Sequence, residues 1–163
     1  MPPSVSASGQ DRFRTPEEKD LPQLYRLDHE SFGEIEGYPY FFLRQLFDAH
    51  RRDFLLLERS GVLCGYALPV LSAQEDTGLL LALAVLPAFQ GQGCGRALLH
   101  AAVLHIRNSG ARRMNLVVRP DNHAARHLYT SYGFTGDELQ PGYYGEGRDR
   151  ILMSLALSAP SKD

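Results

Sequence analysis

The most constraining feature of the sequence is a glycine-rich segment between a predicted strand and a predicted helix. Residues Gln90–Arg96 read QGQGCGR, with glycine at positions 91, 93 and 95. The preceding run Leu79–Leu86 is apolar, and the residues after the segment repeat apolar side chains at helical spacing. Glycine allows the backbone to come close to a ligand, and a helix start adds partial positive charge. The segment is therefore a candidate anion site, suited to phosphate or pyrophosphate.

Two familiar phosphate-binding loops do not fit this segment. A Walker A loop ends in Gly-Lys-Ser/Thr, whereas Gly95 is followed by Arg96 and Ala97. A Rossmann fingerprint needs a third glycine where Arg96 stands, and it lies beside the first strand of its fold rather than after the fourth. Taken alone, the loop is also compatible with a strand-to-helix turn that binds nothing.

The order of predicted elements indicates an α/β (α+β) fold. We expect β-α-α-β-β-β-α-β-α-β-β, forming a mixed, mostly antiparallel central sheet of about seven strands with helices on both faces. The short connections among the second to fourth strands favour an antiparallel meander. The predicted strands cover residues 13–14, 53–58, 62–71, 79–86, 113–118, 134–139 and 150–157, and the predicted helices start near residues 17, 40, 94 and 122.

The length of 163 residues is typical of one domain, which we expect to span residues 13–157. Residues 1–12 and 158–163 are rich in small and polar side chains, so we expect disordered tails there.

The composition argues against several classes of partner. A net charge of −2 lacks the basic excess of a nucleic-acid binder. The longest apolar run, residues 78–89, is too short to span a membrane. The two cysteines, Cys64 and Cys94, cannot form a disulfide scaffold and fit no zinc motif, and the histidines show no metal spacing. We therefore expect a cytoplasmic protein without a metal.

Two longer segments resemble motifs of one family. Leu83–Leu99 is similar to motif A of the GNAT acetyltransferase superfamily, and Asn115–Phe134 is similar to its motif B, with an Asn…Ala…Leu-Tyr…Gly-Phe framework. The segment Tyr143–Met153 resembles the end of protein N-terminal acetyltransferases, especially the ribosomal-protein-alanine type. The resemblance extends from about Leu79 to Leu157 and implies a GNAT-like fold.

The resemblance also implies acetyl-CoA as co-substrate and a set of contacts with it. Backbone groups at the strand end would pair with the pantetheine arm, amides of the loop would hold the pyrophosphate, and an asparagine would bond CoA. The matching residues are Leu83, Ala84 and Val85 at the strand end, Gly91, Gln92, Gly93, Cys94, Gly95 and Arg96 in the loop, and Asn122 as the asparagine.

Acetyl transfer to an amine needs a base for the amine, stabilisation of an oxyanion and a proton donor for the leaving thiolate. The resemblance assigns the oxyanion to backbone N–H groups near Val85 and makes Tyr129 the general acid. Core packing is the other interpretation of Tyr129. The glutamate that serves as base in the ribosomal-protein-alanine type is replaced by Val117.

A base must therefore come from elsewhere, or the amine must arrive partly deprotonated. We expect Glu34 and Glu36, in a predicted loop over residues 33–39, to be candidates that act through water. Glu75, Asp76 and His123 are further candidates for the base, and a solvated charge is the competing interpretation of each.

Three functions remain open on the sequence. The first is an N-acetyltransferase that works by direct attack in a ternary complex on a protein or peptide N-terminus, favoured by the Tyr143–Met153 ending. The second is acetylation of a small molecule such as an amino acid, polyamine or antibiotic, favoured by Val117. The third is a non-catalytic CoA-binding module. We expect an amine acceptor as partner, no nucleic acid or membrane, and a monomer or homodimer.

Overall fold

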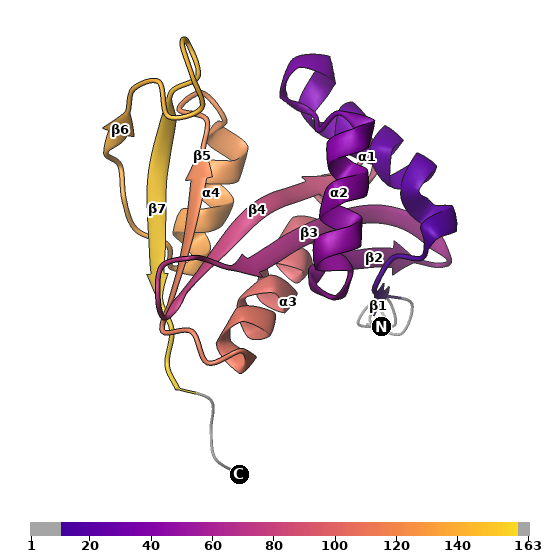
Figure 1. The fold of residues 1–163 in the computed structure, drawn as a ribbon, viewed down its shortest axis with the longest axis horizontal. Coiled ribbons are helices and arrows are strands. Elements are labelled where there is room, and N and C mark those ends of the chain that lie inside the picture. The colour runs from indigo at the N-terminus through magenta and orange to yellow at the C-terminus, as the bar shows by residue number, and fades with distance from the viewer. Residues whose placement is uncertain (1–10, 160–163) are drawn as a thin grey trace, which may run out of the picture. The chain divides into compact units, whose positions relative to one another are not determined.

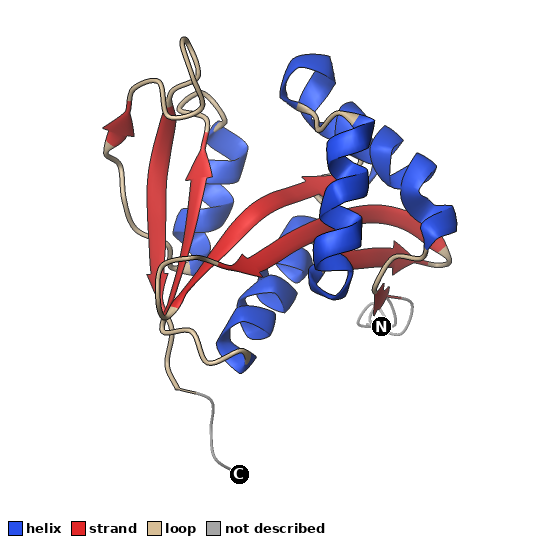
Figure 2. Cartoon of the chain, in the orientation of Figure 1, coloured by secondary structure: helices blue, strands red, loops and turns tan. Residues whose placement is uncertain are grey.

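The computed structural model describes residues 11–159, and within this range seven strands form one sheet (Figures 1 and 2). Their order in the sheet is β1-β2-β3-β4-β5-β7-β6. The β4–β5 pair is parallel, whereas the β1–β2, β2–β3, β5–β7 and β6–β7 pairs are antiparallel, so the predicted mixed, mostly antiparallel sheet is confirmed. The strands are β1 (Asp11–Arg14), β2 (Leu55–Arg59), β3 (Val62–Leu71), β4 (Thr77–Val85), β5 (Arg113–Val118), β6 (Leu139–Gln140) and β7 (Arg150–Ala156).

The helices follow the predicted order. The four α-helices are α1 (Leu21–Glu36), α2 (Tyr40–His50), α3 (Cys94–Asn108) and α4 (His123–Tyr132) among the described residues. Three short 3-10 turns accompany them, η1 (Glu18–Asp20), η2 (Arg51–Asp53) and η3 (Pro87–Phe89). None of the helices in this part of the chain has the length and apolarity needed to cross a bilayer.

The chain divides into two compact units, each of which is described by itself below. The first unit comprises Met1–Leu68 with Ala82–Leu99, and the second comprises Pro69–Leu81 with His100–Asp163. The expectation of one domain over residues 13–157 stays a prediction.

In the first unit, strand β3 carries helices on its two faces. A side chain at Gly65 would lie 2.8 Å from Cδ1 of Leu98 in α3, so glycine allows this helix to pack against the strand. The next residue, Tyr66, points to the opposite face, where its hydroxyl donates to the buried carboxyl of Asp28 in α1. Figure 1 shows α1 and α2 together over the strands on that face. The prediction of helices on both faces holds in this unit.

The Asp28 carboxyl also fixes the connection from α1 to α2. Its Oδ2 accepts a 2.7 Å hydrogen bond from the amide of Tyr38, and His29 Nε2 lies 3.1 Å from the Tyr38 carbonyl oxygen. Burial raises the pKa of Asp28, while the hydrogen bonds from Tyr66 and Tyr38 oppose that rise. Asp28 is thus a buried polar anchor for the start of α2.

In the second unit, β5 lies between β4 and β7. The parallel register with β4 runs from Thr77↔Arg113 to Leu80↔Leu116. A side chain at Gly78 would lie 2.3 Å from Cγ2 of Ile106, so the absence of one lets α3 approach the sheet closely. Helix α4 ends at Gly133, whose φ of 128° is available to glycine at low cost.

Three local predictions differ from the structure. The predicted strand 134–139 is wrong: only Thr135 bridges to Ser154, and β6 covers Leu139–Gln140. Gly136 interrupts the extended chain, because its φ is 129° and its backbone passes close to the Leu152 carbonyl. The predicted loop 33–39 is wrong over residues 34–36, since α1 continues to Glu36 across a single non-helical residue, Gly33, and only residues 37–39 connect the two helices.

The boundary of the N-terminal tail is the third difference. Asp11 and Arg12, assigned to a tail over residues 1–12, pair with Arg59 and Glu58 in a strand. Residues 1–10 of that predicted tail lie outside the described residues, as do residues 160–163 of the predicted tail 158–163.

An ion pair joins β1 to the start of the helical layer of the first unit. The Asp20 carboxylate accepts hydrogen bonds of 2.7 and 2.9 Å from Nη1 and Nη2 of Arg14, and another of 2.7 Å from the Glu17 amide. Arg14 Nε donates to Glu58 on β2 at 2.7 Å. The hydrogen bonds from Arg14 lower the pKa of Asp20, against the opposing effect of burial.

We predict that Asp20→Asn lowers the free energy of unfolding by about 2 kcal/mol at neutral pH, the scale of hydrogen bonds to a charged group. Because the pKa of Asp20 is lowered in the fold, its contribution is complete above the unfolded value of 3.8 and is lost as pH falls through the folded value. Urea denaturation at stepwise lower pH should show the wild type approaching the variant.

The matched control is Asp48→Asn, which breaks an exposed pair with Arg44 on α2. Such a pair contributes about 0.3–0.5 kcal/mol, so this variant should denature close to the wild type at every pH. Equal stability of the Asp20 variant and the wild type at neutral pH would contradict the proposed weight of the Arg14–Asp20 pair.

Candidate functional site

The glycine-rich segment lies in the first unit, between the end of β4 and the start of α3, as predicted (Figure 1). Two of its side chains fold back on its own backbone. Gln90 Nε2 donates to the Val85 carbonyl at 3.1 Å, and Gln92 Nε2 donates to the Ala88 carbonyl at 3.0 Å. These bonds hold the loop in a defined shape, in which the two glutamines and the glycines at positions 91 and 93 are all exposed.

Two glycines of the loop adopt backbone conformations with positive φ, which glycine adopts more readily than other residues. Gly91 has a φ of 75° and Gly93 a φ of 84°, and an added Cβ would meet no atom within 4 Å at either position. Glycine is therefore needed for the backbone conformation, and the space around it is open. The Ala97 amide donates to the Gly93 carbonyl at 3.1 Å, so the amides of Cys94 and Gly95 precede the first helical hydrogen bond. This combination can bind an anion.

The Cys94 side chain points into the core, so the residue can offer only its backbone to a ligand. It is 1% exposed, and its sulfur lies 3.9 Å from the sulfur of Cys64. Burial raises the pKa of Cys64 to about 12, and its thiol donates to the Leu57 carbonyl at 3.3 Å. Both thiols are free in the structure, and the pair serves packing.

A contact that the sequence pattern did not indicate holds the loop from outside. Arg59, the last residue of β2, donates from Nη1 to the Gln92 carbonyl at 3.1 Å. No local signal in the sequence marks this contact, because its two residues lie 33 positions apart in the chain.

The end of β4 presents backbone groups away from β3. The Leu86 amide donates to the Cys64 carbonyl at 2.9 Å, so Leu86 faces β3. Because N–H directions alternate along a strand, the Val85 N–H points to the other side. The Val85 carbonyl accepts from Ser31 Oγ at 3.3 Å, which ties the strand end to α1. Residues Leu83–Val85 lie beyond Leu80, the last residue of β4 registered with β5.

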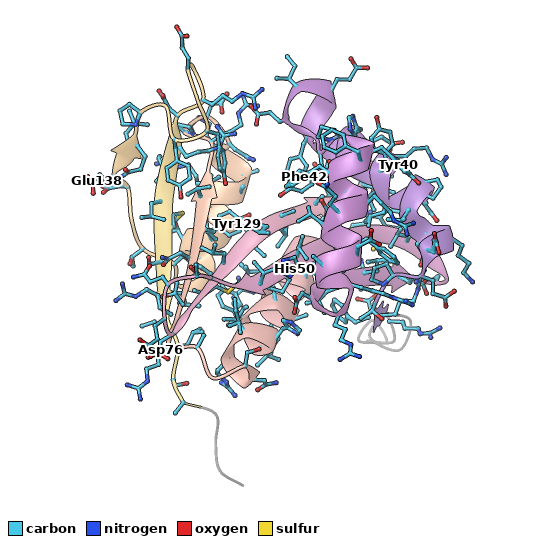
Figure 3. The ribbon with its side chains drawn as sticks, in the orientation of Figure 1. Tyr40, Phe42, His50, Asp76, Tyr129 and Glu138 are labelled. Atoms are coloured by element: carbon cyan, nitrogen blue, oxygen red, sulfur yellow. The ribbon has the colours of Figure 1, made fainter. Side chains whose placement is uncertain are left out.

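Tyr129 and Asn122 lie in the second unit, on α4 and at its N-cap. Tyr129 is buried, its ring makes an edge contact with Phe134 at 6.0 Å, and Figure 3 labels it on this helix. Burial raises the pKa of Tyr129 to about 12, so its hydroxyl keeps its proton at neutral pH. Within residues 11–159 no hydrogen bond is identified for this hydroxyl. Asn122 Oδ1 accepts from the Ala125 amide at 3.1 Å, which caps the helix and leaves the Asn122 NH₂ group as a donor.

The two glutamates proposed as bases lie in the first unit, in the last turn of α1 rather than in a loop. Glu34 follows the break at Gly33 and is exposed, whereas Glu36 is half-buried. Val117 lies on β5 in the second unit, where it pairs with Leu152 of β7. The other three candidates for the base lie elsewhere. His123 begins α4, whereas Glu75 and Asp76 form the turn between β3 and β4.

An exposed apolar patch surrounds the α1–α2 connection in the first unit. It consists of Ile35, Tyr40, Phe41 and Phe42, of which Ile35 is 77% and Phe41 68% exposed. Figure 3 labels Tyr40 and Phe42 on α2, where Tyr40 contacts Tyr25 and Phe42 contacts Tyr38 through their ring edges. Clustered exposed apolar side chains are typical of binding surfaces.

The charged and sulfur-containing side chains show no metal centre in the part of the chain that the structure describes. No group of three His, Cys, Asp or Glu residues between Asp11 and residue 159 is arranged to hold an ion.

Comparison with known proteins places the chain in one family. Residues 19–134 match the model of the "Acetyltransferase (GNAT) family". The chain is 31% identical over 148 residues to the [ribosomal protein bS18]-alanine N-acetyltransferase of Escherichia coli (strain K12). The aligned residues cover 87% of this chain and 95% of that protein.

Two further similarities were found. The chain is 32% identical over 142 residues to a mycothiol acetyltransferase of Propionibacterium freudenreichii, covering 82% of this chain but 45% of that protein. The crystal structure of the ribosomal-protein-S18-alanine N-acetyltransferase from Escherichia coli matches with a TM-score of 0.73 and 26% identity, covering 94% of this chain and 97% of that one.

Proposed function

Because the chain belongs to the acetyltransferase (GNAT) family and is an acetyl-CoA-dependent N-acetyltransferase, we propose that its acceptor is the N-terminal amine of a protein or peptide. The observation that carries this proposal is the identity of 31% to an enzyme that acetylates a ribosomal protein, over 87% of this chain. The exposed patch of Ile35, Tyr40, Phe41 and Phe42 supports it, since a peptide can cover a surface that a small amine cannot.

The residues at the loop fit acetyl-CoA. Open space at Gly91 and Gly93, outward backbone and the start of α3 suit its pyrophosphate. The backbone of Leu83–Val85, beyond the β4–β5 register, is proposed to pair with the pantetheine arm. We assign the amides from Gly91 to Arg96 and the NH₂ group of Asn122 to the remaining CoA contacts.

Tyr129 is proposed as the general acid. Bound acetyl-CoA supplies the acetyl group as a thioester. The buried Tyr129 hydroxyl, which is protonated at neutral pH, would donate its proton to the leaving sulfur. The Val85 N–H, which points away from β3, donates to the acetyl oxygen as negative charge develops there.

Glu34 and Glu36 are proposed as bases that act through a water molecule. Both lie in the last turn of α1, on either side of Ile35 of the apolar patch, just before the connection that the Tyr38–Asp28 hydrogen bond anchors. The amine attacks directly while both substrates are bound, with no acyl-enzyme step.

A small-molecule acceptor is the second candidate. It is favoured by the similarity to a mycothiol acetyltransferase and by the apolar Val117.

The acceptor is tested by measuring acetyl-CoA consumption with a panel of peptides and free amines. We expect peptides with an N-terminal alanine to be acetylated at their α-amine, with kcat/KM at least about tenfold above that of free amino acids, polyamines and aminoglycosides. The same peptides blocked at the N-terminus serve as the control. A preference for a free amine would replace the proposal with the second candidate.

The acid role of Tyr129 is tested by Tyr129→Phe, which keeps the ring packed on Phe134. We expect kcat to fall about 10²-fold with little change in CoA affinity, as for loss of a general acid. The control is Tyr132→Phe, which removes another hydroxyl of α4 that is bonded to His100 at 2.8 Å. If both variants turn over like the wild type, Tyr129 is only a packing residue.

The loop assignment is tested by Gly93→Ala, which strains a backbone with a φ of 84° without filling occupied space. We expect a cost of about 1 kcal/mol in stability and a rise of about tenfold in the Kd for CoA, measured by calorimetry. Gly110→Ala is the matched control, with a φ of 88° and equally open space, in the turn after α3. It should lose similar stability and keep its CoA affinity.

A further inference from the structure

Arg59 reaches the glycine-rich loop from the end of β2, far from the loop along the chain. Its Nη1 donates to the Gln92 carbonyl, the middle of the segment between Gly91 and Gly93. The loop bonds from the Gln90 and Gln92 side chains join residues four or five apart in sequence. Arg59 differs because it connects the loop to β2, an element of the sheet.

The geometry points to Arg59 as a positioning residue that holds the Gln92 carbonyl and so directs the Gly93 amide toward the pyrophosphate of acetyl-CoA. The inference rests on the proposed binding of pyrophosphate by the loop. In a trans peptide unit the carbonyl and the following N–H point in opposite directions. A guanidinium that fixes the Gln92 carbonyl on one side therefore presents the Gly93 N–H on the other side.

A free glycine loop would sample many orientations of this peptide unit, because glycine has few steric limits. Each productive contact with an anion would then require ordering of the loop on binding, at a cost in affinity. A hydrogen bond from a charged donor to the carbonyl reduces that cost before the ligand arrives.

Arg59 is itself held in place by β1. Its Nε and Nη2 donate to the two carboxylate oxygens of Asp11 at 2.7 and 2.8 Å, which leaves Nη1 directed to Gln92. Both side chains are about three-quarters buried, with 24% exposure for Arg59 and 23% for Asp11. The hydrogen bond from Arg59 lowers the pKa of Asp11, so this carboxylate stays ionised at neutral pH. The bidentate pair restricts the guanidinium to one plane.

The test compares two acetyl donors that differ in the pyrophosphate. With acetyl-CoA, Arg59→Ala should raise KM about tenfold, the effect of one lost hydrogen bond of about 1.4 kcal/mol, and leave kcat unchanged. With S-acetylpantetheine, which has no pyrophosphate, the same variant should keep the kcat/KM of the wild type. A residue that acts only through overall stability would affect both donors alike.

The matched control is Arg14→Ala. Arg14 joins β1, β2 and Asp20 through a similar set of ion pairs, is 20% exposed, and makes no contact with the loop. It should lose stability while keeping the KM for acetyl-CoA. If Arg59→Ala does not fold, Asp11→Asn replaces it, since the weakened pair should raise the KM for acetyl-CoA by a smaller factor and again spare S-acetylpantetheine.

The outcomes separate this inference from the proposed function. If Gly93→Ala weakens CoA binding while Arg59→Ala and Asp11→Asn leave the KM for acetyl-CoA unchanged, Arg59 has no positioning role and the loop assignment stands. An equal loss with both donors likewise overturns the positioning role. If neither the loop variant nor the Arg59 variant changes the affinity for CoA, the loop is not the pyrophosphate site and both proposals fail.

Discussion

The close contact of β3 with β4 and α3 at Gly65 is the constraint on which the site in the first unit depends. A side chain there would lie 2.7 Å from the Ala84 carbonyl oxygen and 2.8 Å from Cδ1 of Leu98, so glycine allows β3 to lie this close to both elements. The connection from β4 to α3, residues 86–93, therefore joins two elements that both pack on β3 here. Within it, Gly91 and Gly93 have φ of 75° and 84°, conformations that glycine adopts readily.

The sequence predicted correctly those strands whose bounds are set by their own residues and the turns beside them. Strands β3 and β5 have the predicted bounds, because each is a run of apolar residues ended by turn residues or by a change of period. The errors fall where a single backbone conformation decides the outcome. Gly136 interrupts the predicted strand 134–139, and Gly33 bends a helix without ending it. Nothing in the neighbouring residue types specifies these conformations.

The residues of the candidate site also fall into two groups, those that the sequence indicates and those that it does not. Its loop and the capping Asn122 could be found from the sequence, since contiguous residues form them. Arg59, Ser31 and Asp28 could not, because each acts through a partner far along the chain: Gln92, Val85 and Tyr66 respectively. Such residues look like ordinary surface or helix positions until the sheet brings their partners to them. They are the parts that orient the backbone groups which the sequence motifs supply.

The lack of an obvious base in this chain itself bears on the acceptor. Val117 stands where the family resemblance places the base, and its side chain cannot accept a proton. An enzyme without a strong base works best on an amine that loses its proton easily. An α-amino group has a pKa of about 7.7–8.0, whereas a lysine-type alkylamine has one of about 10.4. At neutral pH roughly a tenth of the former is already free amine, against less than a thousandth of the latter. Exposed carboxylates that act through water suffice to remove the proton from an α-amine, but hardly from the more basic amines of a polyamine. The absence of a glutamate at Val117 is therefore compatible with the proposed protein N-terminus as acceptor, and among small-molecule acceptors it is more compatible with weakly basic amines than with polyamines.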